Sequence, residues 1–193
     1  VLDGSFGPKP DEEDVHAALE RGLIELAGAE TAGKIRAGRS RNDQIATLIR
    51  SFLLDAASEI EKLLHGYIGA LISQATKQRG VAMPGRTHFQ HAQPVLLSHH
   101  LLAHAWPMVR NLERLADWRK RANLSPYGSG ALAGNTLGLD PNLVAHELCF
   151  AGVTQNSMDA TASRDVVAEF SFITAMMAVD LSLHLLTTTS VMH

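Results

Sequence analysis

The chain has 193 residues, of which 46% are hydrophobic and only 19% are charged, so it can form a core and is not a disordered protein. A formal net charge of −3 argues against nucleic-acid binding that is driven by bulk charge. The single cysteine, Cys149, excludes an internal disulfide and a cysteine metal cluster, and it indicates a reducing, cytoplasmic setting.

The N-terminal part is expected to contain one helix between two loops. No charged segment followed by an apolar one comes after Val1, so we expect no signal peptide, and the missing initiator methionine indicates a fragment or a trimmed protein. Asp11 is the expected N-cap of the helix, with Asp14 as a weaker capping-box partner, and Gly28 is the expected stop. Residues 34–42 are predicted to be a basic loop that contains glycine.

Three long helices are predicted from apolar residues that recur every three or four positions. They cover residues 43–78, 95–122 and 164–192. The first has apolar residues on more than one side, which is typical of a helix inside a bundle. Pro107 lies within the second, where we expect a kink or a break. Since aromatic residues are only 5%, the predicted fold class is all-α, a bundle of long helices.

The last helix is long enough to cross a membrane, because residues 170–192 carry one formal charge, Asp180. That carboxylate lies near the middle of the segment, where it costs about 2.5–3.5 kcal/mol to insert. A helix packed inside a soluble bundle is therefore the preferred interpretation, and no membrane partner is expected.

The connections are predicted to be mostly loops. Residues 83–94 are broken by proline and glycine, residues 125–138 are rich in glycine and serine, and residues 154–163 are polar. A short helix is expected from Pro141 to near Gly152.

The first candidate site is the segment Gly-Arg-Ser-Arg-Asn-Asp-Gln at residues 38–44, at the start of the first long helix. Two guanidinium groups beside a helix N-terminus suit a carboxylate or another anion. Ordinary capping by Asn42 or Asp43, with exposed arginines, explains the same residues equally well.

The second candidate site is residues 84–94, Pro-Gly-Arg-Thr-His-Phe-Gln-His-Ala-Gln-Pro. Histidine is the usual side chain for moving a proton near neutral pH, and Thr87 and Gln90 can orient a carboxylate or an amide. Taken alone, a polar loop with solvated histidines is the simpler explanation.

The third candidate site is residues 125–134, Ser-Pro-Tyr-Gly-Ser-Gly-Ala-Leu-Ala-Gly, whose backbone could cradle an anion. Small residues that permit close helix packing are the preferred explanation for these residues alone. His100 and His104 have metal-like spacing but no acidic residue between them, so no metal site is predicted.

Together these segments resemble the argininosuccinate lyase family of the fumarase/aspartase superfamily. The Arg-Ser-Arg-Asn-Asp form within residues 38–44 is the discriminating part, and residues 84–94 and 125–134 match in order. Residues 156–170, with Asn-Ser-Met-Asp-Ala and Arg-Asp-Val-Val-Ala-Glu-Phe, also match, as does Glu-Asp-Val-His at residues 13–16.

The resemblance implies a homotetramer that cleaves argininosuccinate to arginine and fumarate by anti elimination, without a metal or organic cofactor. Residues 1–40 would be the end of the N-terminal domain with the first active-site loop. Residues 41–193 would be a truncated central helical-bundle domain. The implied partners are the small-molecule substrate and further copies of the chain.

The resemblance also implies roles for individual residues. Ser40, Arg41 and Asn42 would bind substrate together with Gln90, Thr87 would hold a carboxylate, and His88 would be the general base or assist it. The family's main catalytic serine lies in a mobile loop whose signature this sequence lacks. The isolated chain is therefore expected to be inactive.

Two departures and two alternatives accompany the resemblance. Arg36 and Ala37 stand where the family usually has His-Thr, and His91 stands where arginine is common. One alternative is a structural, crystallin-like member without activity. The other is a superfamily lyase that acts on adenylosuccinate or aspartate. The apolar long helices predict self-association, and the resemblance implies that Asn42 and His88 meet across a subunit boundary.

Overall fold

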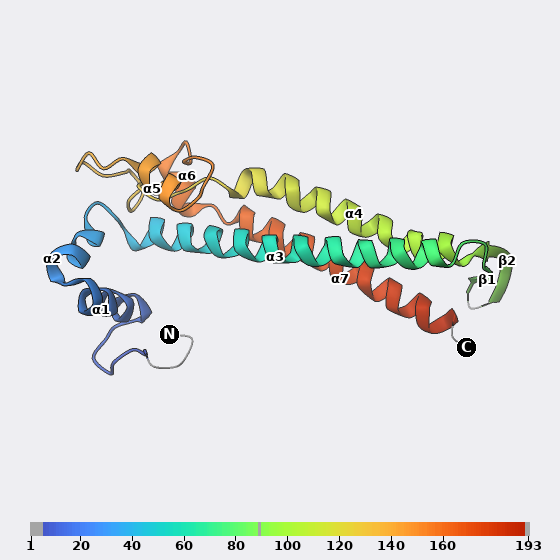
Figure 1. The fold of residues 1–193 in the computed structure, drawn as a ribbon. Coiled ribbons are helices and arrows are strands. Elements are labelled where there is room, and N and C mark those ends of the chain that lie inside the picture. Colours follow the sequence, from blue (N-terminus) through green and yellow to red (C-terminus); the bar gives the residue numbers. More distant parts are fainter. Residues whose placement is uncertain (1–5, 89, 192–193) are drawn as a thin grey trace.

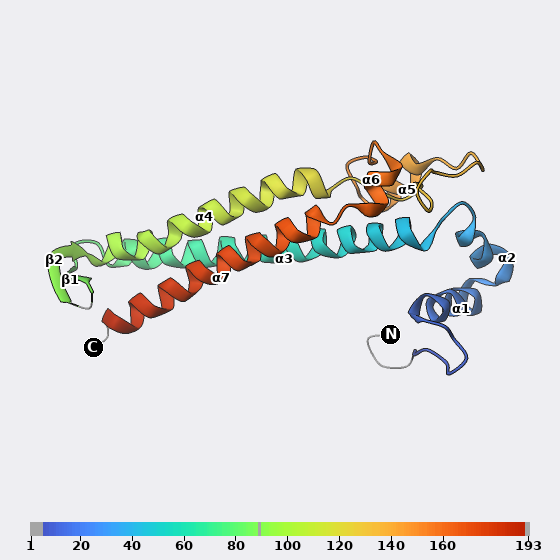
Figure 2. The ribbon, with the colours of Figure 1, turned by 180° about the vertical axis from the view of Figure 1, so that it is seen from behind.

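Three long helices dominate the computed structural model, which describes residues 6–88 and 90–191, with side chains up to Thr187. Helices α3 (Arg41–Lys77), α4 (Leu97–Ala122) and α7 (Asp165–Val191) run along one another and form an elongated bundle (Figures 1 and 2). The all-α prediction and the positions of the three long helices are confirmed. Their ends differ from the predicted ends by at most two residues, and the predicted end at residue 192 lies outside the described residues.

The two ends of the bundle carry different small elements (Figure 1). The N-terminal end of α3 lies near α1 (Val15–Ala27), α2 (Ala29–Ala32), η1 (Gly33–Arg36), α5 (Pro141–Glu147) and α6 (Ser157–Ala162). The opposite end carries an antiparallel hairpin, β1 (Ala82–Thr87) and β2 (Gln90–Leu96).

The hairpin corrects the prediction of a loop over residues 83–94. Proline cannot donate a ladder hydrogen bond, but Pro84 and Pro94 face each other beside an irregularity in the register between Pro84 and Arg86. Prolines are tolerated at such a bulge. Gly85 permits it, since a Cβ there would lie 2.5 Å from the carbonyl oxygen of Gln93.

Several predicted boundaries were also wrong for local reasons. The N-cap of α1 is Asp14, not Asp11, because Oδ1 of Asp14 accepts from the N–H groups of His16 and Ala17. The stop at Gly28 is confirmed. A 3₁₀ turn, η1, occupies the start of the predicted loop at residues 34–42.

Two short helices also differ from their predicted form. Helix α6 occupies part of residues 154–163, predicted as a loop, because Asn156 caps it by accepting from Met158 and Asp159. Such a short helix has too few apolar residues for a visible period. Helix α5 starts at Pro141 as predicted, but ends at Glu147 instead of near Gly152.

Helix α4 continues through Pro107, so of the predicted kink or break the break is wrong and the kink stays a prediction. Pro107 lacks the N–H that would bond to the preceding turn, which normally destabilises a helix. Ala105 and Met108, on either side of it, are buried, and Met108 belongs to the core cluster of the three long helices. This packing offsets the missing hydrogen bond.

The core lies where the three long helices meet. Trp118 of α4 is fully buried, and its Nε1 donates to the carbonyl of Val166 at the start of α7 over 2.9 Å. Met108 and Leu115 are buried in the same cluster. A polar contact crosses the bundle further along, where Nδ2 of buried Asn111 donates to Oδ2 of Asp180 over 2.8 Å.

Helix α7 meets the length and composition test for a membrane span over Asp165–Thr187. Ile173 and Met177 pack into the core, and Asp180 bonds to Asn111. Most of its remaining apolar side chains are exposed in the single chain. One face of α7 therefore packs into the core of this bundle, and its other face is exposed in the single chain.

Candidate functional site

The predicted site residues lie in two groups at opposite ends of α3. Ser40, Arg41 and Asn42 are at its N-terminus, whereas the hairpin with Thr87, His88 and Gln90 lies beyond its C-terminus (Figure 1). A helix of 37 residues is about 55 Å long at 1.5 Å per residue. The two groups therefore do not meet within one chain.

A capping box fixes the first group. Ser40 is the N-cap of α3, with its side chain accepting from backbone N–H groups of the first turn, and Asp43 returns a bond to the backbone N–H of Ser40 over 2.9 Å. The alternative in which Asn42 or Asp43 is the N-cap is thus wrong. The Ser-x-x-Asp spacing at residues 40–43 is the sequence signal that could have shown it.

Asp43 lies beside the predicted site residues, and the sequence analysis considered it only as an alternative N-cap. Its side chain is 0% exposed, yet it has three backbone partners. Oδ1 accepts from Ser40, and Oδ2 accepts from the N–H groups of Gly128 at 3.1 Å and Gly130 at 2.9 Å. The glycine-rich segment was considered as an anion cradle, and the anion that it holds here is the protein's own carboxylate.

The glycine-rich segment is also attached on either side of that carboxylate. Nδ2 of Asn42, an exposed residue, donates to the carbonyl of Ala131 over 3.1 Å. Oγ of Ser157, in the first turn of α6, donates to the carbonyl of Leu132 over 2.7 Å. Residues 38–44, residues 125–134 and the start of residues 156–170 therefore meet at one end of the bundle.

The two arginines of the first segment are paired with acidic residues of α1 and its cap. Nη1 of Arg41 lies 2.6 Å from Oδ2 of Asp14, and Nη2 of Arg39 lies 3.9 Å from Oε2 of Glu20. Nη1 of Arg39 also donates to Gln44 over 2.6 Å. In the single chain both guanidinium groups bind protein partners. They are therefore not the solvent-exposed arginines of the capping explanation, and they are not left free for an external anion.

Electrostatics at Asp14 agree with this arrangement. The N–H of Ala17 lowers the pKa of the Asp14 carboxyl most, and the Arg41 guanidinium lowers it further. The carboxylate thus stays charged near neutral pH, where it holds both the start of α1 and the first residue of α3.

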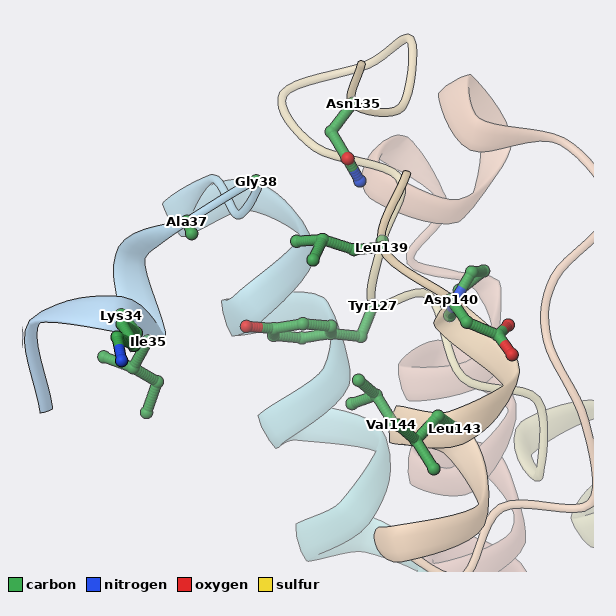
Figure 3. A pocket seen from close by; sticks show the side chains of 12 residues that line it. Lys34, Ile35, Ala37, Gly38, Tyr127, Asn135, Leu139, Asp140, Leu143 and Val144 are labelled. Atoms are coloured by element: carbon green, nitrogen blue, oxygen red, sulfur yellow. The ribbon is translucent and has the colours of Figure 1, made fainter. Parts of the chain in front are cut away.

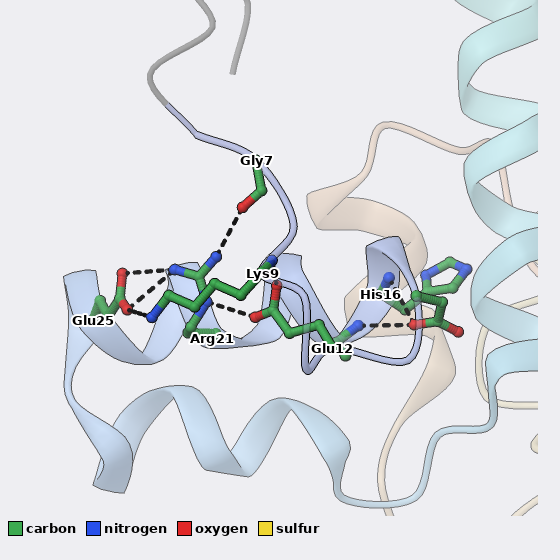
Figure 4. A network of polar contacts seen from close by, with 8 residues as sticks. Gly7, Lys9, Glu12, His16, Arg21 and Glu25 are labelled. Carbon is green, nitrogen blue, oxygen red and sulfur yellow. Dashed lines mark hydrogen bonds and ion pairs between the residues drawn. The ribbon is translucent and has the colours of Figure 1, made fainter.

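A second polar network holds the N-terminal segment on α1 (Figure 4). Arg21 donates to Oε1 of Glu12 over 2.5 Å, to Glu25 over 3.1 Å and to the carbonyl of Gly7 over 3.0 Å. The Arg21 hydrogen bond is the largest cause that lowers the pKa of Glu12. The network fixes the entry to α1, and with it the Asp14 carboxylate beside the site.

The second group of predicted residues is exposed on the hairpin. Thr87 and Gln90 are register partners at the end of the two strands. His88 follows Thr87 in the turn and has a positive φ of 50°, a left-handed conformation that is uncommon for a residue with a side chain. Strained backbone of this kind concentrates at functional sites.

A cavity of about 230 Å³ lies beside the first group (Figure 3). One side of the cavity is lined by η1, Ala37 and Gly38, and the other by residues 139–144, with Tyr127 between them. Burial raises the pKa of the Tyr127 hydroxyl, and the Asp43 carboxylate adds to this. None of the predicted site residues lines the cavity, so we do not assign it to substrate.

Three histidines meet inside the bundle near the hairpin end. The ring of His104 stacks on that of His184 with centroids 4.3 Å apart, and His100 meets His104 edge-on at 4.9 Å. Burial, with the two neighbouring rings, lowers the pKa of His104 to about 4. Among the described residues, no group of three or more His, Cys, Asp or Glu side chains is arranged to hold a metal ion.

Comparison with known proteins identifies the family. The family described as "Lyase" matches residues 3–183, which is nearly the whole chain. The chain belongs to this lyase family. The resemblance that the motifs predicted is therefore confirmed at the family level.

Individual relatives of this lyase-family chain are similar over the same region. It is 64% identical to an argininosuccinate lyase of Leifsonia xyli subsp. xyli and 62% identical to one of Thermobifida fusca, in each case over 182 residues. Both alignments cover 94% of this chain and 38% of the relative. The chain thus spans little more than a third of the length of these curated relatives.

Two solved structures share the fold of this lyase-family chain. EDDS lyase in complex with formate superposes with a TM-score of 0.80 at 33% identity, covering 86% of this chain and 33% of that one. A variant of EDDS lyase with bound fumarate gives 0.77 at 34% identity, covering 86% and 32%. These matches agree with the predicted superfamily fold.

Proposed function

We propose that the whole protein that contains this chain cleaves argininosuccinate to arginine and fumarate. One observation carries the proposal: curated relatives named argininosuccinate lyase are 61–64% identical over 94% of this chain. Neither a crystallin-like protein nor a lyase for adenylosuccinate or aspartate has comparable support. We also propose a cytoplasmic location and a domain boundary near residue 40.

The reaction breaks a carbon–nitrogen bond and forms a carbon–carbon double bond. A base removes a proton from the carbon beside the one that bears the nitrogen, the electron pair forms the double bond, and the leaving nitrogen takes up a proton. The adjacent carboxylate absorbs charge in the transition state and needs hydrogen-bond donors. This elimination has no net oxidation, so it requires no redox cofactor.

Each end of α3 supplies part of what this chemistry needs. In our proposal Ser40, Arg41 and Asn42 bind substrate at one end of the helix. At the other end, Thr87 and Gln90 bind the carboxylate and His88 moves or assists the proton. The exposure of His88 in the turn between the register partners Thr87 and Gln90 supports this role.

The two ends can form one site only if they come from different copies of the chain. About 55 Å of helix separates them within one copy, whereas an antiparallel neighbour would bring its hairpin beside the N-terminus of α3. We therefore propose a shared active site in a homo-oligomer, with the homotetramer that the family resemblance implies.

The exposed apolar surface of the long helices supports self-association. Water exposure of apolar area costs about 25 cal/mol per Å², and a large exposed patch usually marks an interface. Side chains that are at least 45% exposed in the single chain are Leu48, Phe52, Leu63, Ile72, Trp106, Phe172, Val179, Leu181, Leu183, Leu185 and Leu186.

The proposed activity is tested on the purified full-length protein. Argininosuccinate, adenylosuccinate and aspartate are offered separately, and fumarate is followed by its ultraviolet absorbance. We expect rapid fumarate release from argininosuccinate alone. Release from another of these substrates, or from none, would contradict the proposal.

A further inference from the structure

We propose that Asp43 is a positioning residue, whose buried carboxylate holds the glycine-rich segment at residues 125–134 against the first turn of α3 and thereby orients Asn42. The inference rests on the proposed function for its catalytic part, because Asn42 is one of the proposed substrate-binding residues. The connection between the segments stands independently of which substrate is used.

The burial and bonding of Asp43 carry the first step. A carboxylate that is 0% exposed is costly unless its oxygens accept hydrogen bonds. Both oxygens of Asp43 do so, Oδ1 from its own helix cap and Oδ2 from Gly128 and Gly130. The side chain of Asp43 therefore joins the start of α3 to Gly128 and Gly130, which lie 85 and 87 residues further along the chain.

The glycines allow the segment to form the tight turn that meets Asp43. Gly128 and Gly130 have positive φ values of 97° and 62°, which glycine adopts without strain. A Cβ on Gly130 would lie 2.5 Å from the carbonyl oxygen of Gly134, and one on Gly128 would lie 2.7 Å from Cβ of Pro141. In this tight turn their N–H groups converge on Oδ2 of Asp43.

Asn42 connects this turn to the proposed chemistry. Its side chain donates from Nδ2 to the carbonyl of Ala131, directly after Gly130. That contact uses one amide hydrogen and leaves the amide exposed at the helix N-terminus. The orientation of Asn42 is therefore set by the segment that Asp43 holds in place.

The test begins with Asp43→Asn in the full-length protein. An asparagine has the same shape but presents an NH₂ group where one oxygen accepted, so either the cap or the glycine pair loses its acceptor. Asp55→Asn, on the exposed side of the same helix, is the charge-matched control. The readouts are hydrogen exchange of residues 125–134 and steady-state kinetics with argininosuccinate.

We expect faster exchange in that segment for Asp43→Asn alone, and a loss of about 10²-fold in kcat/KM, the size of effect that a misplacement of about 1 Å can have. A positioning role also predicts non-additivity: Asn42→Ala with Asp43→Asn should be no worse than Asn42→Ala. Unchanged exchange, or fully additive losses, would overturn the inference.

If Asp43→Asn does not fold, the same contact is tested from the other segment. Gly130→Ala introduces the 2.5 Å clash, whereas Gly138→Ala has a similar φ of 67° and nothing within 4 Å. We expect faster exchange and reduced kcat/KM only for Gly130→Ala, and equal behaviour of the two would overturn the inference. Failure of the proposed function is distinguishable, since the parent would then release no fumarate while the exchange readout still applies.

Discussion

At the scale of single residues, His88 combines an uncommon backbone conformation with the proposed proton-transfer role. Its left-handed conformation, φ 50°, costs on the order of 1 kcal/mol for a residue with a side chain. Asparagine tolerates this conformation better than most residues. We therefore expect His88→Asn in the full-length protein to keep the melting temperature while kcat falls by about 10²–10⁴-fold, as for the loss of a proton-transfer group.

The matched control for this change is His91→Asn. His91 is an exposed histidine on β2 of the same hairpin, opposite Arg86. Its replacement should leave kcat within about a few-fold of the parent, because side-chain effects on catalysis depend on contact with the reacting groups. A His88→Asn enzyme with nearly full activity would make His88 a solvated turn residue and remove it from the mechanism.

The residues at positions 38–44 were identified from the sequence, but their contacts with one another and with the glycine-rich segment were not. Ser40 and Asp43 form a local capping box that the Ser-x-x-Asp spacing encodes. The second half of the Asp43 arrangement depends on Gly128 and Gly130, which are brought there by the tertiary fold. The same reason explains why the pairing of Arg41 with Asp14 was not predicted.

At the scale of elements, long periodic helices were predicted well and short ones poorly. An amphipathic pattern over many turns identifies α3, α4 and α7. The hairpin was predicted as a loop because its prolines normally break strands. Gly85, which lies at the irregularity in the register, is the sequence signal that could have indicated a bulge. Helix α6 is specified by its Asn156 cap more than by any period.

The polar contact between α4 and α7 gives a prediction for stability. Asn111 is 0% exposed, donates to Asp180 and accepts from Nη1 of Arg114 over 2.8 Å. Asn111→Ala leaves both partners without this bond, so we expect the full-length protein to lose about 1–3 kcal/mol of unfolding free energy. Denaturant unfolding followed by circular dichroism measures this loss.

A matched control on the same helix is Lys120→Ala. Lys120 makes an exposed ion pair with Asp117, at 3.7 Å, and such pairs contribute about 0–1 kcal/mol. Equal losses for the two variants would mean that the buried contact between α4 and α7 contributes no more than a surface pair.

The histidine cluster of the same helices predicts a loss of stability in acid. The pKa of His104 falls from 6.5 to about 4 on folding, so the unfolded state binds more protons between these values. Its stabilising contribution is complete above pH 6.5 and is lost as the pH falls towards 4. The groups that face His104 are the rings of His100 and His184 and the hydroxyl of Thr187, and Tyr67 in turn bonds to His184.

This dependence is measured as the change in melting temperature between pH 7 and pH 5. In His104→Gln the change should be smaller than in the parent by about 2–4 °C, since glutamine does not titrate. His146→Gln removes an exposed histidine on α5 and should follow the parent. A His104→Gln protein that loses as much stability in acid as the parent would contradict the titration of this cluster.

At the scale of the whole molecule, the length of α3 decides how a site can be built. The sequence predicted a helix of nearly this length, with the polar segments at residues 38–44 and 84–94 at its two ends. A single chain holds both halves of the proposed site apart while its long helices expose apolar side chains. The shared site therefore follows from helix geometry together with the proposed function.

The measurement that tests this shared site most directly is complementation between two inactive full-length variants. Asn42→Ala and His88→Asn each damage one half of every site when they are pure. If the halves come from different copies, random mixing after dissociation should restore both native halves in about a quarter of the sites. We predict that the mixture regains fumarate release from argininosuccinate, whereas a mixture that stays as inactive as its components, although the subunits have exchanged, would contradict the account.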